Sequence, residues 1–235
     1  MRMNNAERMF SLVAATLVLT PYACGAAQRG YERPRAHFDT ASIRLEQNTS
    51  DGDGEALITL RGPNGTGVSK IKVIAPNRLP VFELEAERGG RLGMGQMVFE
   101  TPEPTIPEVK QAFPPGVYHF VGRGTNGAVV TGEATLSHNF PAAPILTYPI
   151  DGAIGIPTET LQILWTPVAN ATGYFVELEQ KDLGLVNKID IQGIQSTFSP
   201  PAGWMLPGVE YVLAVGSIGA DGNRSFTEIH FTTAQ

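Results

Sequence analysis

The chain has 235 residues, which suits one large all-β domain or two domains of about 100 residues each. Charged residues make up 17% of it, against about 25% in an average soluble domain, and it contains 26 glycines and 18 prolines. This composition argues against a helical bundle or a polytopic membrane protein, because glycine and proline interrupt long helices. The formal net charge of −6, with no basic stripe, argues against nucleic-acid binding.

The amino terminus has the features of an export signal. Arg2 and Arg8 flank the start of an apolar run over residues 9–20, which has the size of a signal-peptide core and is too short to span a bilayer. Small residues follow, so a signal peptidase can cut after Ala27. The sequence therefore predicts a cleaved signal peptide over residues 1–27 and a secreted or periplasmic protein.

Cys24 leaves a second interpretation open, in which the protein is a lipid-anchored envelope protein acylated at this cysteine. Pro21 and Tyr22 depart from the pattern of a bacterial lipoprotein box, although Ala23 fits it. An uncleaved anchor and a mis-assigned start are further alternatives. Because Cys24 is the single cysteine, no internal disulfide can form, and an exported form must be held by its hydrophobic core.

Short strand-like segments separated by turn clusters fill most of the remaining chain. Apolar and polar residues alternate in several of them, which is typical of a sheet with one wet face. Gly, Pro, Asn and Asp gather between them, as in turns. The predicted strands are residues 42–47, 55–61, 68–74, 81–86, 97–101, 117–121, 129–137, 145–148, 161–165, 173–179, 185–191, 196–199, 209–218 and 225–232.

Two segments differ from this strand pattern. Thr105, followed three residues later by Glu108, has the spacing of a capping box and predicts a short helix that Pro114 would end. The Pro-Ala-Ala-Pro segment at 141–144 predicts a stiff linker, because proline restricts the backbone. The expected domains after the signal peptide are a β-rich, sandwich-like domain and a second β domain, over residues 28–140 and 141–235.

The second domain carries a more specific pattern. Trp165 ends its second predicted strand, Tyr174 lies at the start of the third, and Tyr211 follows a Pro-Gly turn within residues 206–215 (LPGVEYVLAV). These residues resemble a fibronectin type III domain, here in an exported bacterial protein of a poorly characterised family. The resemblance implies an immunoglobulin-like sandwich with Trp165 between its sheets and a tyrosine corner at Tyr211. The predicted fold class is therefore all-β, with two β-sandwich-like domains.

The first domain contains a stretch that parallels this corner. Residues 113–118 (FPPGVY) precede a predicted strand, a Thr-Asn-Gly turn and another strand, as residues 206–211 do in the second domain. A related fold would explain the parallel. Coincidence is the alternative, because Pro-Gly before a strand is common turn chemistry.

Asn48, Asp51, Asp53 and Glu55 are the best candidate metal ligands in the sequence. Carboxylate and amide oxygens suit calcium, and no other cofactor is expected. A plain acidic turn is the alternative, because an EF-hand alignment on the glycine of this segment would put Leu60 at the last ligand position.

Other motifs have simpler interpretations. Residues 122–127 spell G-x-G-x-x-G, but the Asn-Gly pair before alternating residues predicts a hairpin turn and not a nucleotide-binding loop. Phe198 and Trp204 form either part of the core or an exposed aromatic platform. The histidines lack the spacing of zinc ligands; they are His37, His119, His138 and His230. Four N-x-[ST] sequons matter only if the host glycosylates its proteins; their asparagines are Asn48, Asn64, Asn170 and Asn223.

The sequence offers no nucleophile with an adjacent base and orienting group. It therefore predicts a non-catalytic, exported binding or structural module at the bacterial cell envelope, with the fibronectin type III domain as a scaffold for protein or glycan interaction. A carbohydrate-binding accessory or another extracellular enzyme component is the alternative. The expected partner is an envelope protein or glycan, with membrane attachment only if Cys24 is lipidated.

Overall fold

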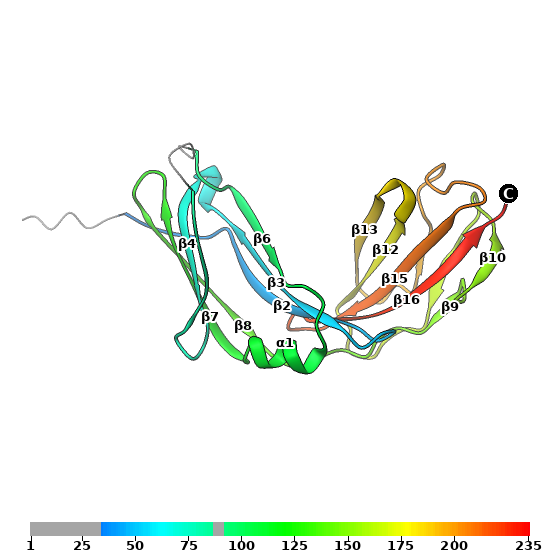
Figure 1. Ribbon diagram of the computed structural model, residues 1–235, viewed down its shortest axis with the longest axis horizontal. Helices are drawn as coiled ribbons and strands as arrows, with labels where there is room; N and C mark the ends of the chain where they lie inside the picture. The colour runs from blue at the N-terminus through cyan, green and yellow to red at the C-terminus, as the bar shows by residue number, and fades with distance from the viewer. Residues whose placement is uncertain (1–33, 87–91) are drawn as a thin grey trace, which may run out of the picture. The chain divides into compact units, whose positions relative to one another are not determined.

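The computed structural model describes residues 34–86 and 92–235, which belong to one compact unit. The predicted signal peptide over residues 1–27, with Cys24, lies outside the described residues. The regular secondary structure of the described residues is almost entirely β-strand, as the sequence predicts (Figure 1). No helix within the described ranges is long and apolar enough to cross a membrane.

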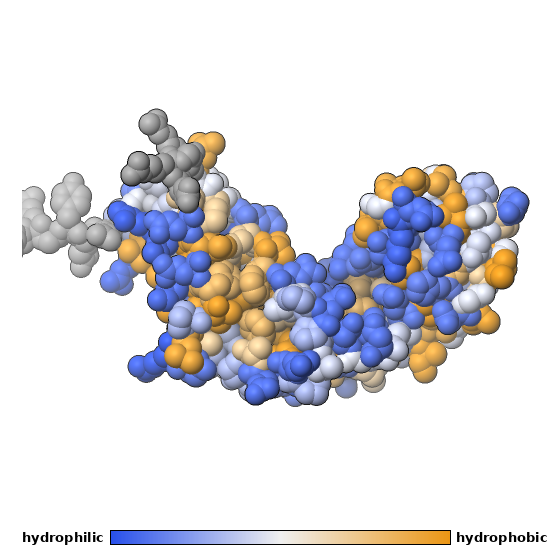
Figure 2. Space-filling model, in the orientation of Figure 1, coloured by the Kyte–Doolittle hydropathy of each residue, from blue (hydrophilic) through white to orange (hydrophobic). Residues whose placement is uncertain are grey.

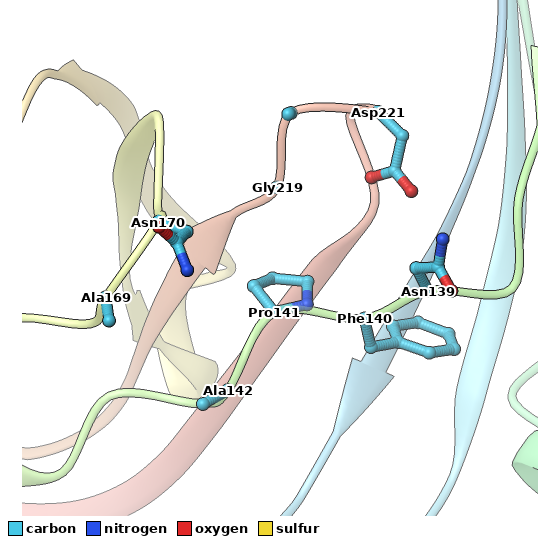
Figure 3. A pocket seen from close by; sticks show the side chains of 9 residues that line it. Asn139, Phe140, Pro141, Ala142, Ala169, Asn170, Gly219 and Asp221 are labelled. Carbon is cyan, nitrogen blue, oxygen red and sulfur yellow. The ribbon is translucent and has the colours of Figure 1, made fainter.

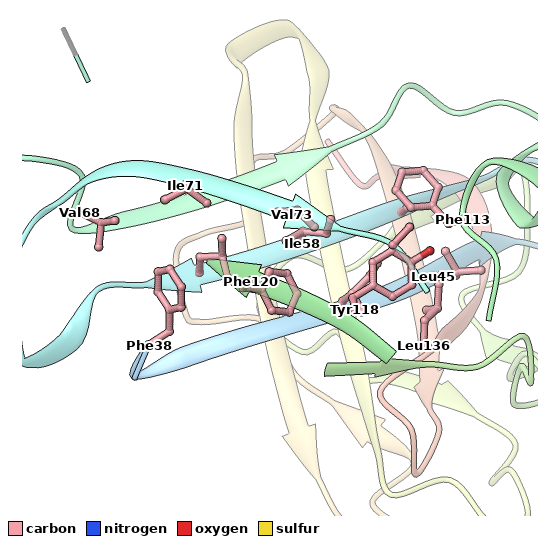
Figure 4. Close-up of a cluster of buried hydrophobic side chains, with 14 of the residues drawn as sticks. Phe38, Leu45, Ile58, Val68, Ile71, Val73, Phe113, Tyr118, Phe120 and Leu136 are labelled. Carbon is pink, nitrogen blue, oxygen red and sulfur yellow. The ribbon is translucent and has the colours of Figure 1, made fainter. Parts of the chain in front are cut away.

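Two layers of strands form the first sandwich. One layer follows the order β1 (Arg35–His37), β8 (Val129–Leu136), β7 (Gly116–Gly124), β4 (Val68–Ile74) and β5 (Pro80–Glu85). The facing layer follows the order β2 (Thr40–Asn48), β3 (Gly54–Arg61) and β6 (Gln96–Glu100). Apolar side chains alternate along these strands, so both layers point them into one shared core, which includes Leu45, Ile58, Tyr118 and Phe120 (Figure 4).

The first sandwich also contains the predicted helix, α1 (Ile106–Ala112), and a short 3₁₀ turn, η1 (Pro63–Gly65). The carboxylate of Glu108 accepts hydrogen bonds from the backbone N–H and the hydroxyl of Thr105, at 3.0 and 2.7 Å. The helix ends before the two prolines at 114 and 115, and Val109 and Phe113 pack into the core. The helix prediction is confirmed.

The second sandwich has a large and a small layer. The large layer follows the order β13 (Leu185–Gln192), β12 (Gly173–Gln180), β15 (Glu210–Ile218), β16 (Arg224–Thr233) and β10 (Ala153–Ile156). The small layer follows the order β14 (Thr197–Phe198), β11 (Ile163–Trp165) and β9 (Leu146–Tyr148), and η2 (Lys181–Leu183) joins β12 to β13. Trp165 lies between the layers, buried, with its ring centroid 5.4 Å from that of Tyr174.

The two sandwiches share one strand order. The layer β5-β4-β7-β8-β1 corresponds to β13-β12-β15-β16-β10, and β6-β3-β2 corresponds to β14-β11-β9. In each sandwich the last strand gains a parallel partner, β1 on β8 and β10 on β16. β1 is equivalent to β10, and β2 is equivalent to β9. The first two strands of the sandwiches therefore follow opposite orders along the chain, since β1 precedes β2 but β10 follows β9. The sandwiches therefore have related but not identical topologies.

A buried tyrosine closes the equivalent corner of each sandwich. The hydroxyl of Tyr211 accepts a hydrogen bond from the backbone N–H of Leu206 at 2.8 Å. The hydroxyl of Tyr118 donates to the carbonyl of Pro114 at 3.0 Å, and burial raises the pKa of Tyr118 to about 12. The segments that look alike in the sequence thus hold equivalent places, which favours a related fold over coincidence.

The predicted strands are confirmed, most of them to within two residues at each end, and residues 141–145 have no regular secondary structure. Sequence reasoning missed two strands, β1 and β10. Both are short, and each joins its sheet in parallel at an edge. Such strands lack the alternation over four to eight residues that identifies a strand in a sequence.

We expect Tyr118→Phe and Tyr211→Phe each to lower the free energy of unfolding by about 1 kcal/mol, because each removes one hydrogen bond from a buried corner. Tyr148→Phe is the matched control, since Tyr148 is 36% exposed. Urea unfolding monitored by circular dichroism measures the three variants. Equal stability of the corner variants and the control would contradict a structural role for the hydroxyl groups.

Candidate functional site

The junction between the two sandwiches is the most elaborate polar site in the described chain. Residues 224–226 of β16 pair in parallel with residues 46–48 of β2, so one sheet runs through both sandwiches. The β2–β3 turn extends this contact. The backbone N–H of Thr49 donates to the carbonyl of Phe226 at 2.9 Å, and the hydroxyl of Ser50 donates to the carbonyl of Glu228 at 3.1 Å.

Asn223 fastens this junction. Its amide nitrogen donates to the carbonyls of Ser137 and Asn139 at 3.0 and 2.8 Å, and its amide oxygen accepts from the backbone N–H of Leu45 at 2.8 Å. The residue is 1% exposed. A buried amide needs partners for both its donors and its acceptor, and here they come from β2 and from the segment that follows β8.

Hydrogen bonds also hold the proline-rich segment against β15 and β16. The hydroxyl of Ser217 donates to the carbonyl of Ala142 at 2.6 Å, and that of Thr227 donates to the carbonyl of Pro144 at 2.9 Å. The segment is therefore attached along its length to the second sandwich.

A hollow of about 470 Å³ lies beside this segment, and Figure 3 shows Pro141 between the loop of Asn170 and the loop of Gly219 and Asp221. Asp221 is the one titratable side chain in its lining, and its carboxylate accepts hydrogen bonds from the hydroxyl of Ser137 and the backbone N–H of Asn223. The lining offers no nucleophile with a base beside it, so the hollow has no catalytic constellation.

A line of charged side chains crosses the junction on one face of the shared sheet. Nη2 of Arg224 lies 2.8 Å from the carboxylate of Asp190, and its Nε lies 3.4 Å from Glu46, which also pairs with Arg44 at 2.6 Å. The side chain of Arg224 is 10% exposed and lies over the ring of Phe175, 5.0 Å from its centroid. These ion pairs compensate one another, so the face carries little net charge.

Glu55 lies on β3 in the same row of the sheet, opposite Glu46. Burial, followed by a hydrogen bond shared with Glu100 and the negative charges of Glu100 and Glu46, raises the pKa of Glu55 to about 8. Two neighbouring carboxylates share one proton more readily than they both ionise in a partly buried place. Glu55 is therefore largely protonated at neutral pH.

Three of the four candidate calcium ligands, Asn48, Asp51 and Asp53, lie together in the β2–β3 turn, and Glu55 lies apart from them. The amide of Asn48 donates to the carboxylate of Asp51 at 3.1 Å and accepts from the backbone N–H of Ser50 at 3.0 Å, which makes the turn rigid. Burial and the neighbouring Asp51 raise the pKa of Asp53 to about 6, whereas Glu55 turns to Glu100. No group of three His, Cys, Asp or Glu side chains in residues 34–86 and 92–235 is placed to hold a metal ion. Calcium binding stays a prediction.

The remaining sequence motifs have structural places. The G-x-G-x-x-G stretch forms the β7–β8 hairpin turn, closed by the N–H of Gly127 on the carbonyl of Gly124 at 2.9 Å, which confirms the turn. Trp204 packs on Tyr211 with centroids 5.6 Å apart, and Phe198 contacts the same core, so neither forms an exposed platform. His119 and His230 pair with Glu133 and Glu210 on the surface.

Sequence reasoning missed the junction. Asn48 and Asn223 belong to sequons in predicted turns, and the structure buries both. The one available signal was a turn with the composition Asp-Gly-Asn, which is common in exposed hairpins. The partners of Asn223 lie some 80 and 180 residues away along the chain, so no local pattern reveals them.

No protein-family model matches the chain, and no curated protein matches it. Solved structures of fibronectin type III modules do match over most of its length. The fibronectin(III)-like modules of CbhA from Clostridium thermocellum are 12% identical, with 88% of this chain and 93% of that chain covered and a TM-score of 0.34. A two-domain fibronectin type III segment of chicken tenascin is 12% identical, covering 84% and 99%, with a TM-score of 0.31.

The strand order, the inter-layer tryptophan and the tyrosine corners decide the assignment, independently of these scores. The fold is fibronectin type III-like. The fold alone assigns no function, because unrelated functions share such sandwiches and lie in their loops and sheet edges.

We expect Asn223→Ala to lower the free energy of unfolding by about 3 kcal/mol, because it leaves the buried N–H of Leu45 and two part-buried carbonyls without their partner. Asn139→Ala is the matched control, since Asn139 contributes its backbone carbonyl to the junction and its side chain is exposed. Thermal and urea unfolding measure both variants. A loss below about 0.5 kcal/mol for Asn223→Ala would contradict its role at the junction.

We expect stability to fall as the pH rises from about 5 to about 8. The folded pKa of Glu55 is near 8 against a usual value of 4.5, so the folded protein keeps a proton that the unfolded chain releases. The stability that this proton contributes is present below pH 4.5 and is lost as the pH passes through 8. Glu55→Gln should flatten this slope in urea titrations at several pH values, whereas Glu159→Gln, at an exposed site, should leave it unchanged.

Proposed function

We propose that this chain is an exported, non-catalytic binding or structural component of the bacterial cell envelope. In this proposal it presents two fibronectin type III-like sandwiches as one connected unit. The main support for this proposal is the junction. Strand pairing, the buried Asn223 and the bound proline-rich segment connect the two sandwiches there. A scaffold that must hold two binding surfaces in a defined arrangement needs such a connection.

The export part of the proposal rests on the amino-terminal sequence. The basic start, the short apolar run and the small residues before position 28 have the order of a cleaved signal. The absence of an internal disulfide is compatible with export, because two separate apolar cores are buried in the described chain.

No specific observation supports the alternative function, an accessory module of a carbohydrate-active enzyme. Such modules commonly bind sugars on exposed aromatic side chains. In the described ranges Tyr148 is the one aromatic residue among the large exposed hydrophobic side chains, and both tryptophans contact the second core. An envelope protein or glycan bound through loops and sheet edges is therefore the proposed partner.

The test is fractionation of bacterial cells that express the tagged full-length chain, combined with chemical crosslinking in the envelope. We expect a mature chain that starts at Gln28, carries no lipid and crosslinks to a defined envelope partner. Asn223→Ala should reduce the partner crosslink at least several-fold, because it loosens the unit that presents both surfaces, while Asn139→Ala should leave it unchanged.

Palmitate labelling of the wild type and of Cys24→Ser distinguishes the two routes of attachment. Palmitate label that is present in the wild type and absent in Cys24→Ser would show that the protein is lipid-anchored, and would contradict the cleaved, lipid-free form. An unprocessed chain in the cytoplasm would contradict export, and a glycan-degrading activity of the purified protein would contradict a non-catalytic role.

A further inference from the structure

Most edge strands in the described chain carry a feature that hinders pairing with another chain. β1, β6, β9 and β14 have five residues or fewer. β5 begins with a proline and shifts its register on β4, and β10 shifts its register on β16. Short length, proline and bulges are the usual protections of exposed sheet edges.

β13 lacks these protections. It has eight residues without proline, it pairs with β12 over its full length without a register shift, and within the described residues β12 is its only strand partner. It is the longest regular edge strand of the described sheets. An unpaired row of N–H and C=O groups on such a strand can accept a further strand.

The ladder with β12 tells which backbone groups of β13 are free. The N–H of Gly193 donates to the carbonyl of Thr172 at 3.2 Å, and the carbonyl of Ile191 points at the backbone of Gly173. Hydrogen-bonded and non-hydrogen-bonded pairs alternate in an antiparallel ladder. The odd-numbered residues of β13 therefore bond to β12, and residues 186, 188, 190 and 192 direct their N–H and C=O groups to the open edge.

A second copy of β13, laid antiparallel on this edge, must match even-numbered residues with even-numbered ones. Centring the pair on Ile189 places Lys188 opposite Asp190 of the second copy, and this happens twice because of the two-fold symmetry. A centre one residue earlier or later places Lys188 opposite its own copy, or Asp190 opposite its own copy. Lys188 and Asp190 each pair within their own copy, with Glu177 and Arg224 at 2.7 and 2.8 Å. The centre on Ile189 adds an attractive contact between the copies, whereas the other two centres add a repulsive one.

The apolar side chains of the strand fit the same arrangement. Ile189 is 41% exposed and lies at the two-fold axis, where it meets its own copy. Leu185 is exposed on the same face of the strand, and Figure 2 shows apolar surface over the β12–β13 hairpin. Pairing removes this apolar surface from water.

We propose that β13 is a self-association edge, which pairs antiparallel with β13 of a second copy of this chain around Ile189. The large sheet then continues from one copy into the other. One added strand pair buries less surface than a standard stable interface of about 1,600 Å², so the dimer forms at micromolar concentrations or above. Attachment to an envelope or a shared partner would supply such local concentrations.

Disulfide trapping tests the proposed register directly, in the full-length chain with Cys24→Ser. A non-hydrogen-bonded antiparallel pair has a Cα separation of about 4.5 Å, within the range that a disulfide bridges. We expect Ile189→Cys to form a crosslinked dimer under mild oxidation at least tenfold faster than Val186→Cys. Val186 is 54% exposed, but its own copy would lie about 20 Å away along the strand.

Sedimentation of the uncrosslinked protein gives the second measurement. The wild-type mass should rise from 25.2 kDa toward twice that value with concentration. Lys188→Glu should raise the dissociation constant at least tenfold, and Lys188→Glu with Asp190→Lys should restore most of the affinity. Thermal unfolding of each variant checks that the fold is retained. A monomer at all concentrations up to about 1 mM, or equal trapping of Ile189→Cys and Val186→Cys, overturns the proposal.

Discussion

The pairing of β2 with β16, fastened by the buried amide of Asn223, is the constraint on which the arrangement of the two sandwiches depends. The paired segments are only three residues long, and so short a parallel pairing is weak by itself. The buried amide adds three hydrogen bonds, and an unmatched buried partner would be costly. The pairing and the amide therefore need each other: β2 positions the N–H of Leu45, and Asn223 holds β2 against β16.

The electrostatics of the junction follow from this pairing. Arg224 and Glu46 face each other because β16 and β2 are neighbours, and Glu55 stands beside Glu46 because β3 pairs with β2. A carboxylate as buried as Glu46 requires cationic partners, which Arg44 and Arg224 supply. Those cations pair with Glu46 and Asp190. Burial, the hydrogen bond with Glu100 and the charges of Glu100 and Glu46 then raise the pKa of Glu55.

Local signals explain how much of the fold could be predicted. Some elements can be recognised from sequence patterns of about ten residues or fewer. They are the strands with period-two alternation, the helix that begins after Thr105, and the Asn-Gly hairpin. β1 and β10 do not, because they consist of three or four residues whose only support is a parallel neighbour. The junction could not be predicted either, because the partners of Asn223 lie 86 and 178 residues away along the chain and leave no local pattern. The candidate metal ligands separate because strand alternation turns Glu55 onto the face of the sheet, away from the turn that holds Asp51 and Asp53.

The tandem arrangement also decides where sheet edges remain for other partners. In an isolated second sandwich, the part of β16 that the short β10 does not cover would be an open edge of its layer. In an isolated first sandwich, β2 would be the outer strand of its layer. Pairing residues 224–226 with residues 46–48 covers that part of both edges and leaves β6 and β13 at the ends of the long sheet. β6 has five residues and ends at Glu100, whereas β13 has eight regular residues. Of the two ends of the long sheet, the longer regular edge therefore lies in the second sandwich.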